Sequence, residues 1–221
     1  MTAFRKIHVL VEGQTEERIV DLVLKRELAP EVVLNPVLVT TRRPAGGPHA
    51  KGGVSRWGKI RDDLKRLLRD SSATAVTTML DYYGLPNDTP GYVDARGISD
   101  PYGRVSHIEC AMAEDISDER FLPFLAMHET EAWVIAAARE LAELLERPDL
   151  ETILREQAAV AGGAELVNDG VETAPSKRIL RAHPRYQKTV DGPDAIDMLG
   201  LSALCEACPH LASWISSLKA C

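Results

Sequence analysis

The sequence has no apolar stretch near the roughly 20 residues that a membrane-spanning helix requires. Its first residues, Met1 to Lys6, are too few and too polar for a signal peptide, and Glu12 interrupts the apolar run behind them. We therefore expect a cytosolic protein that does not enter a membrane. Cysteine is also scarce, with four residues in 221, and in the cytosol we expect these thiols to be reduced.

Two hydrolase classes lack their sequence signatures. The glycine-rich segment 42–53 is not a P-loop, because no lysine–serine or lysine–threonine pair follows the required glycine spacing. The sequence contains no Gly-x-Ser-x-Gly turn, so it does not predict a serine hydrolase.

Positive charge is not in excess in this sequence: the net charge is −7 and the pI is near 5.4. This argues against coating of DNA by bulk charge, but it allows local basic patches.

What the sequence does contain is the pattern of an α/β protein. Hydrophobic residues make up 45% and charged residues 27%, which is enough apolar content for a packed core. Apolar strands alternate with amphipathic helices, and this predicts a parallel sheet with right-handed crossovers. The expected strands are 7–11, 32–40, 75–80 and 121–127, and the expected helices are 15–28, 57–69, 105–114 and 131–145.

The last third of the chain has a different pattern, with short helical segments separated by glycine and proline. We expect residues 1–147 to form the α/β core and residues 148–221 to form a small helical C-terminal extension packed on it. The expected helices of this extension are 150–160, one that starts at Pro175, 193–198, 201–207 and 211–218.

Acidic residues follow two of the apolar strands. Glu12 comes directly after the run 7–11, Glu16 follows four residues later, and Asp81 ends the strand 75–80. Because sites in parallel sheets form at the carboxyl ends of the strands, we expect these acids to share one crevice. Carboxylate oxygens are the ligands that Mg²⁺ and Mn²⁺ prefer. Two plainer interpretations stay open: Glu16 as an acid at a helix start, and Asp81 as a turn cap.

A second acidic segment follows the fourth expected strand. Glu129 and Glu131 lie close together in the sequence, and either one could complete a metal site. His128 precedes them and could act as an acid or a base, because its ordinary pKa is near 6.5. The alternative is a helix start with favourable acids and a half-buried histidine.

Basic residues cluster in two places. The glycine-rich loop and the expected helix start at Pro175 both carry cations that could contact phosphate, with Lys51 neutralising its charge. A solvated loop and a surface helix start are the alternatives. The candidate nucleic-acid-binding residues are Arg42, Arg43, His49, Lys51, Lys177 and Arg178.

Taken together, these segments resemble the TOPRIM fold of topoisomerases, primases and the overcoming-lysogenization-defect nucleases. The resemblance is closer to the bacterial family catalogued as domain of unknown function 4276, and it covers nearly the whole chain. The segments that carry it are Glu12-Gly13-Gln14-Thr15-Glu16, His49-Ala50-Lys51-Gly52-Gly53, Asp81-Tyr82-Tyr83-Gly84, His128-Glu129-Thr130-Glu131-Ala132, Pro175-Ser176-Lys177-Arg178 and Cys208-Pro209-His210-Leu211.

The resemblance implies a TOPRIM-like core, a divalent metal and cleavage or transfer of phosphodiesters in nucleic acid. It also implies a partner ATPase and a setting of phage defence. Glu12 matches the TOPRIM glutamate, Glu16 the second acid of the nuclease branch, and Asp81 the first aspartate of an Asp-x-Asp motif. Tyr83 stands where the second aspartate would be. Either Glu129 or Glu131 replaces it, or one metal binds tightly, or the activity is lost.

The sequence therefore predicts a Mg²⁺- or Mn²⁺-dependent nuclease that acts on DNA or RNA. Its expected catalytic residues are Glu12, Asp81, Lys51 and His128, and its expected metal ligands are Glu12, Glu16, Asp81, Glu129 and Glu131. The rival hypothesis is a non-catalytic subunit that binds nucleic acid or an ATPase on a degenerate TOPRIM scaffold. A small-molecule phosphohydrolase or nucleotidyltransferase is a third.

Overall fold

The fold is built on a parallel sheet, as the alternation of strands and helices predicted. The structure is a computed structural model that describes residues 4–40, 56–168 and 173–221. Strands are hydrogen-bonded in the order β2-β1-β3-β4, and β5 also pairs with β3. All of these pairs are parallel. The strands are β1 (Arg5–Val11), β2 (Val32–Leu38), β3 (Ala75–Asp81), β4 (Phe121–Leu122) and β5 (Leu125–Ala126).

The central strand β1 is buried on both faces, which explains its nearly continuous apolar sequence. Ile7 and Val9 belong to one hydrophobic cluster, whereas Leu10 belongs to another on the opposite face. Val11 is in register with Met79 of β3, two residues before that strand ends. The last residues of β1 and β3 therefore reach the same edge of the sheet.

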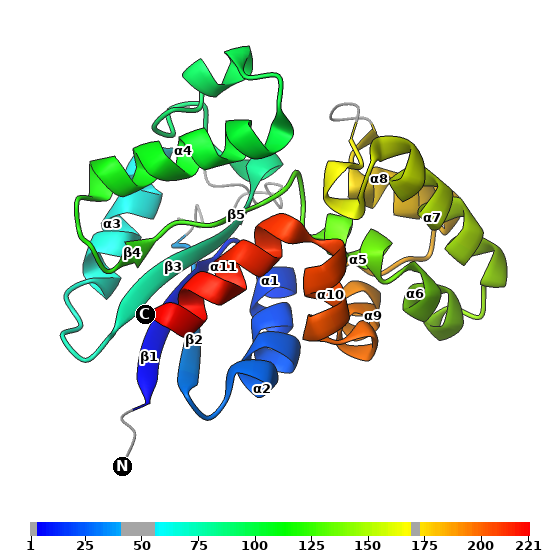
Figure 1. The fold of residues 1–221 in the computed structure, drawn as a ribbon, viewed down its shortest axis with the longest axis horizontal. Helices are drawn as coiled ribbons and strands as arrows, with labels where there is room; N and C mark the ends of the chain where they lie inside the picture. The colour runs from blue at the N-terminus through cyan, green and yellow to red at the C-terminus, as the bar shows by residue number, and fades with distance from the viewer. Residues whose placement is uncertain (1–3, 41–55, 169–172) are drawn as a thin grey trace, which may run out of the picture.

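Helices cover both faces of the sheet (Figure 1). One face is covered by α3 (Trp57–Leu67) and α4 (Pro101–Ile116), whose buried residues share a cluster with Leu10. On the other face, α1 (Gln14–Ile19), a π-helical turn η1 (Val20–Leu24) and α2 (Lys25–Leu28) form one continuous helical segment. Two 3-10 turns, η2 (Tyr82–Gly84) and η3 (Asp94–Gly97), follow β3.

The expected strand 121–127 is interrupted at its centre. The structure has two short strands there, β4 and β5, with Pro123 between them. Proline has no backbone N–H and so cannot continue the ladder. The Thr78 hydroxyl replaces the missing backbone contacts, because it donates to the Phe124 carbonyl at 2.8 Å and accepts from the Phe124 N–H at 2.9 Å.

The expected helix 131–145 is also divided. It consists of α5 (Glu131–Ala136) and α6 (Ala138–Leu144), and the backbone at Ala137 leaves the helical region with ψ at 31°. The remaining elements are α7 (Pro148–Ala161), η4 (Ala164–Leu166), α8 (Pro175–Ala182), α9 (Asp191–Leu199), α10 (Leu201–Ala207) and α11 (Pro209–Ala220). None of the helices in the described residues has the length and hydropathy to span a bilayer.

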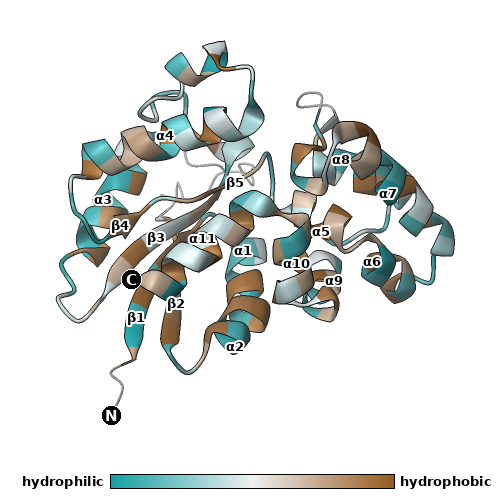
Figure 2. Cartoon of the chain, in the orientation of Figure 1, coloured by the Kyte–Doolittle hydropathy of each residue, from teal (hydrophilic) through white to brown (hydrophobic). Residues whose placement is uncertain are grey.

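The C-terminal helices complete the core instead of standing apart from it. In α11, the Trp214 Nε1–H donates to the Thr77 hydroxyl of β3 at 2.9 Å, and its ring stacks on Phe124 at a centroid distance of 4.2 Å. Ile196 of α9 is fully buried in the cluster that contains Ile7. Figure 2 shows hydrophobic residues concentrated on the strands and on α2, with hydrophilic residues over the peripheral helices. Residues after 147 therefore bury one face of the sheet.

Candidate functional site

Glu12 lies at the carboxyl end of β1 and packs against a glycine from the neighbouring strand end. Its carboxylate rests over Gly84, the last residue of η2. A Cβ atom at Gly84 would lie 2.8 Å from Glu12 Oε1, closer than real contacts allow. Gly84 therefore creates the space that the Glu12 carboxylate occupies.

Thr130 connects two of the predicted acids. Its hydroxyl donates to Glu16 Oε1 at 3.1 Å, and its backbone N–H donates to Asp81 Oδ1 at 2.9 Å. Glu16 is 4% exposed, Asp81 7% and Thr130 1%, so all three groups are enclosed by protein. One residue at the start of α5 thus fixes carboxylates from α1 and from the end of β3.

Lys188 connects Asp81 to a third acid. Its Nζ lies 3.0 Å from Glu131 Oε2 and 3.7 Å from Asp81 Oδ2. Glu131 is 1% exposed, and neither of its oxygens forms a hydrogen bond within the described residues. The contact with Lys188 is thus an ion pair without hydrogen-bond alignment. Glu12, Glu16, Asp81, Glu131 and Lys188 are called the acidic site below.

Burial, with a smaller effect from neighbouring carboxylates, raises the pKa values of three carboxyl groups in the acidic site. Burial raises the pKa of Glu12, and the Glu16 carboxylate raises it further. Burial raises the pKa of Asp81 well above its usual range, and Lys188 only partly reverses this. Burial likewise raises the pKa of Glu131 to about 7, against the opposing effect of Lys188. For Lys188, burial lowers the pKa, but the Glu131 and Asp81 carboxylates outweigh it and raise the pKa overall. The carboxyl groups share too little positive charge.

Glu129 stands beside this cluster but points elsewhere. Its Oε2 accepts the Ser176 N–H at the start of α8, at 3.0 Å. Its charge nevertheless acts on Glu12 and Glu131, raising the pKa of both. Of the two acids predicted in this segment, Glu131 thus belongs to the acidic site, while Glu129 anchors α8 next to it.

His128 lies among aromatic rings. Its ring centroid is 5.4 Å from that of Tyr83, and the residue has a left-handed backbone with φ at 64°. Burial and the nearby Arg104 charge lower the pKa of His128 to about 4, so its ring is neutral at pH 7. Burial also raises the pKa of Tyr83 to about 12, so the phenol adds no negative charge.

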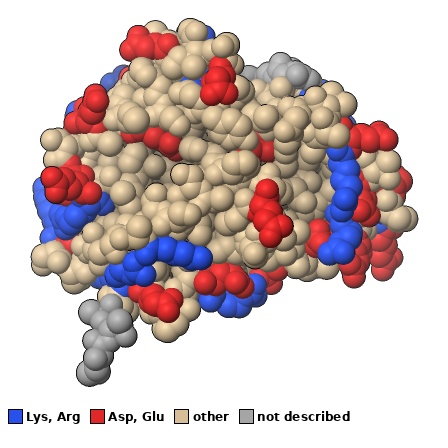
Figure 3. Space-filling view, viewed as in Figure 1, with Lys and Arg blue, Asp and Glu red and all other residues tan. Residues whose placement is uncertain are grey.

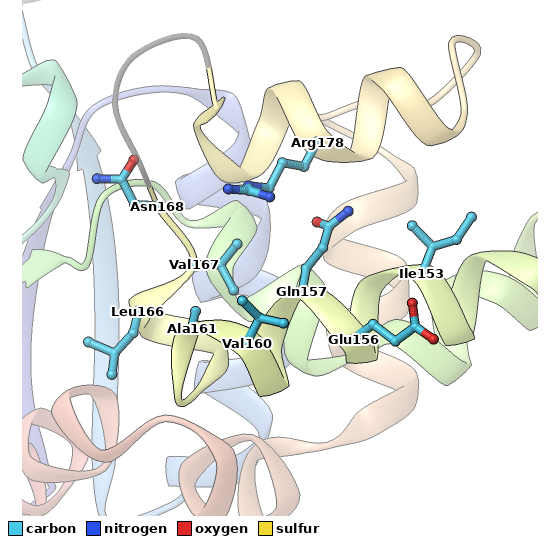
Figure 4. Close-up of a pocket in the computed structure, with 9 residues that line it drawn as sticks. All are labelled: Ile153, Glu156, Gln157, Val160, Ala161, Leu166, Val167, Asn168 and Arg178. Carbon is cyan, nitrogen blue, oxygen red and sulfur yellow. The ribbon is translucent and has the colours of Figure 1, made fainter.

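The predicted cations are not gathered at the acidic site. Lys177 is exposed on α8. Arg178 lines a cavity of about 550 Å³ between α7 and α8, where its side chain and Gln157 reach toward the same space (Figure 4). None of the five predicted carboxylates is among the residues that line this cavity. Arg42, Arg43, His49 and Lys51 lie outside the residues that the structure describes.

Surface charge is mixed on the face shown in Figure 3. Lys and Arg occur along the margins of this face next to Asp and Glu, and its centre consists mainly of uncharged residues. Some of the charged side chains of the molecule form ion pairs: Arg18 contacts Asp194 at 2.7 Å and Arg26 contacts Asp197 at 2.8 Å.

The sequence did not predict Lys188 of the acidic site, nor Thr130, which binds two of its acids. Lys188 lies in the polar stretch between α8 and α9, where no periodicity indicates which way a side chain points. Thr130 stands between two acids that drew attention as ligands, and nothing in the sequence marks it as their partner. A hydroxyl inside an acidic segment at a helix start is the only local signal.

The donor chemistry of the acidic site suits a hard divalent cation. It offers buried carboxylate oxygens, a negative surplus and, at Glu131, two oxygens without hydrogen bonds. In the conformation described, however, no group of three or more His, Cys, Asp or Glu from the described residues converges at metal-binding distances. Lys188 stands between two of the acids instead.

The chain belongs to the family described as Domain of unknown function (DUF4276), whose profile matches residues 11–219. This match spans every residue of the acidic site. Comparisons with curated proteins and with solved structures found no match.

Proposed function

We propose that this protein is a divalent-metal-dependent nuclease that hydrolyses phosphodiester bonds in DNA or RNA. The observation that carries the proposal is that acids far apart in the sequence share partners. Thr130 bonds both Glu16 and Asp81, and Lys188 contacts both Asp81 and Glu131. Burying such acids together destabilises a fold unless a cation compensates for them. A TOPRIM-like core is part of this proposal.

Mg²⁺ or Mn²⁺ would be held by Glu12, Glu16 and Asp81, with Glu131 and Glu129 close by. When bound, such an ion polarises a phosphodiester and lowers the pKa of a coordinated water. The protein's own contribution is to hold the carboxylates in place. Thr130 fixes one oxygen of Glu16 and one of Asp81, and the second oxygen of Asp81 faces Lys188 Nζ at 3.7 Å.

Two groups could carry protons during the reaction. With a pKa raised to about 7, Glu131 can take up or release a proton near neutral pH. With a pKa of about 4, His128 is available only as a base. Its unpartnered Nδ1 is buried, which leaves Glu131 as the better candidate for proton transfer at the acidic site.

The nucleic-acid substrate and the partner are further parts of the proposal. Lys177 is exposed on α8 next to Ser176, whose N–H binds Glu129, and we propose that it contacts the phosphate backbone of the substrate. Arg42, Arg43, His49 and Lys51 would add positive charge from the glycine-rich loop, and Arg178 from its cavity. A partner ATPase and a role in phage defence rest on the family resemblance alone.

A cleavage assay tests the proposal. The purified full chain is incubated with plasmid DNA or with single-stranded RNA in the presence of added Mn²⁺. We expect cleavage that requires the metal and is reduced at least about 100-fold by Glu12→Gln or Asp81→Asn. Matched controls are Glu143→Gln and Asp62→Asn, which remove exposed acids and should leave cleavage unchanged. No cleavage of either polymer in any divalent metal defeats the proposal, as does full activity in both site variants.

A non-catalytic subunit that binds nucleic acid or an ATPase is the second candidate. The observation that favours it is Lys188, whose charge already compensates part of the acidic site without a metal. Such a protein should show no increase in melting temperature when Mn²⁺ is added, whereas the nuclease should be stabilised by metal. Glu12→Gln should abolish that stabilisation, and Glu143→Gln should not.

A further inference from the structure

Lys188 is the cation that contacts two of the buried carboxylates of the acidic site, those of Asp81 and Glu131. It comes from the segment between α8 and α9 and places Nζ against carboxylates from two other parts of the chain, at the end of β3 and at the start of α5. Both carboxylates are buried, whereas the Lys188 side chain keeps 41% of its surface exposed. Its ammonium therefore lies at the boundary between the acidic site and solvent.

An ammonium and a divalent ion compete for the same carboxylates. Ammonium–oxygen contacts are near 3 Å and magnesium–oxygen bonds near 2 Å, so a lysine holds the acids farther apart than a metal does. This agrees with the acids being close to Lys188 while no three of the described metal-binding side chains converge. Because Lys188 is tethered to the chain, its local concentration far exceeds that of a free ion.

Lys188 also has capacity beyond these two contacts. An ammonium has three N–H donors, and the two carboxylates use at most two of them. Its exposed surface lets a phosphate oxygen approach from solvent. Lys188 could therefore contact a substrate phosphate, while Glu12 and Glu16 would hold a metal ion if one binds.

We propose that Lys188 is the second cation of the acidic site, so that the protein binds one divalent ion and the lysine supplies the other positive charge to the substrate phosphate. The ion count rests on the proposed function only in its metal dependence, and the contact of Lys188 with phosphate rests on the proposed substrate. Asp81 is then shared, because Lys188 contacts its Oδ2 while Thr130 holds its Oδ1. Glu131 pairs with the lysine, and Glu12 and Glu16 bind the metal.

The number of bound Mn²⁺ ions tests this inference. It is measured on the full chain at pH 7.5 by electron paramagnetic resonance and by calorimetry. Wild type should bind one ion per chain. Lys188→Met should bind a second ion or bind the first about tenfold more tightly, because an opposing charge is gone. Lys188→Arg keeps the charge and should still bind one ion. Lys65→Met removes an exposed lysine from α3 and serves as the control.

Each result of the count decides one question. Two tightly bound ions in wild type overturn the inference but leave the nuclease proposal intact. Unchanged stoichiometry and affinity in Lys188→Met have the same consequence. No binding in wild type defeats both. The expected counts without cleavage of any polymer support the assignment of Lys188 as the second cation and reject the nuclease. If Lys188→Met does not fold, Lys188→Gln replaces it in the count: a second or a more tightly bound ion supports the inference, and unchanged binding overturns it.

Discussion

At the scale of single residues, the acidic site depends on small groups beside the acids. Gly84 leaves room for the Glu12 carboxylate, and Thr130 orients oxygens of Glu16 and Asp81. Neither residue carries charge, and each acts through a neighbour. Such residues can be tested separately from the acids, because replacing them changes carboxylate position without changing the charge of the site.

Gly84→Ala should displace the Glu12 carboxylate and weaken Mn²⁺ binding by about tenfold or more. The added methyl group would meet the flexible end of a side chain, so the free energy of unfolding should change by less than about 1 kcal/mol. Gly97→Ala is the control, since a Cβ there meets no atom within 4 Å. Calorimetry and urea denaturation measure the two effects. Unchanged Mn²⁺ affinity in Gly84→Ala would mean that Glu12 is not a ligand.

Thr130→Val removes the hydroxyl that binds Glu16 and keeps the side-chain shape. We expect a loss of about 1–2 kcal/mol in the free energy of unfolding without metal, because a buried carboxylate loses a donor. Thr130→Ser keeps the hydroxyl and should restore the wild-type pH profile of cleavage. If valine and serine behave alike, the hydroxyl has no role in positioning Glu16.

At the scale of elements, the apolar pattern was sufficient to locate nearly every strand and helix. The strand 121–127 and the helix 131–145 were each placed correctly but are divided in the structure. The division of the strand follows from Pro123. The Thr78 hydroxyl binds the backbone beside it, at Phe124, which is 46 residues away in sequence. The break at Ala137 has no local signal, since alanine favours helix. Long-range packing, which one sequence does not reveal, decides such details.

Glu165 shows how one buried acid can hold elements together. Its carboxylate accepts the backbone N–H groups of His210 and Leu211 at 2.9 and 3.1 Å, at the start of α11. Glu165→Ala leaves both donors unpaired and should lower the free energy of unfolding by about 2–4 kcal/mol. Glu156→Ala, an exposed change on α7, should stay within about 0.5 kcal/mol of wild type. Equal stability of the two variants in urea would contradict this role.

At the scale of the whole molecule, the acidic site joins parts of the chain that the sequence did not connect. The acids at the ends of β1 and β3 were predictable, because a carboxylate after a buried apolar run is a local signal. Lys188 reaches the site only because the C-terminal helices pack on the sheet. Its role therefore needs the tertiary structure. The sequence already shows Tyr83 in place of a second aspartate, but it does not predict the positive charge of Lys188 beside Asp81 and Glu131.

The surplus negative charge should make stability depend on pH. The pKa of Glu131 is about 7 in the folded protein, against an ordinary value of 4.5. Between these values the folded state binds more protons than the unfolded state, so stability falls as pH rises. Without metal, wild type should lose on the order of 2 kcal/mol between pH 5 and pH 7 relative to Glu131→Gln. Urea denaturation in EDTA measures this difference, and a parallel pH dependence of the two proteins would refute the assignment.

The central claim is that the acids at the ends of β1 and β3 bind a divalent metal. Anomalous diffraction at the manganese edge tests it most directly, with crystals of the full chain soaked in Mn²⁺. The account predicts one manganese peak about 2 Å from carboxylate oxygens of Glu12 and Asp81, with Lys188 still beside Glu131. A peak elsewhere, or none at saturating Mn²⁺, would contradict it.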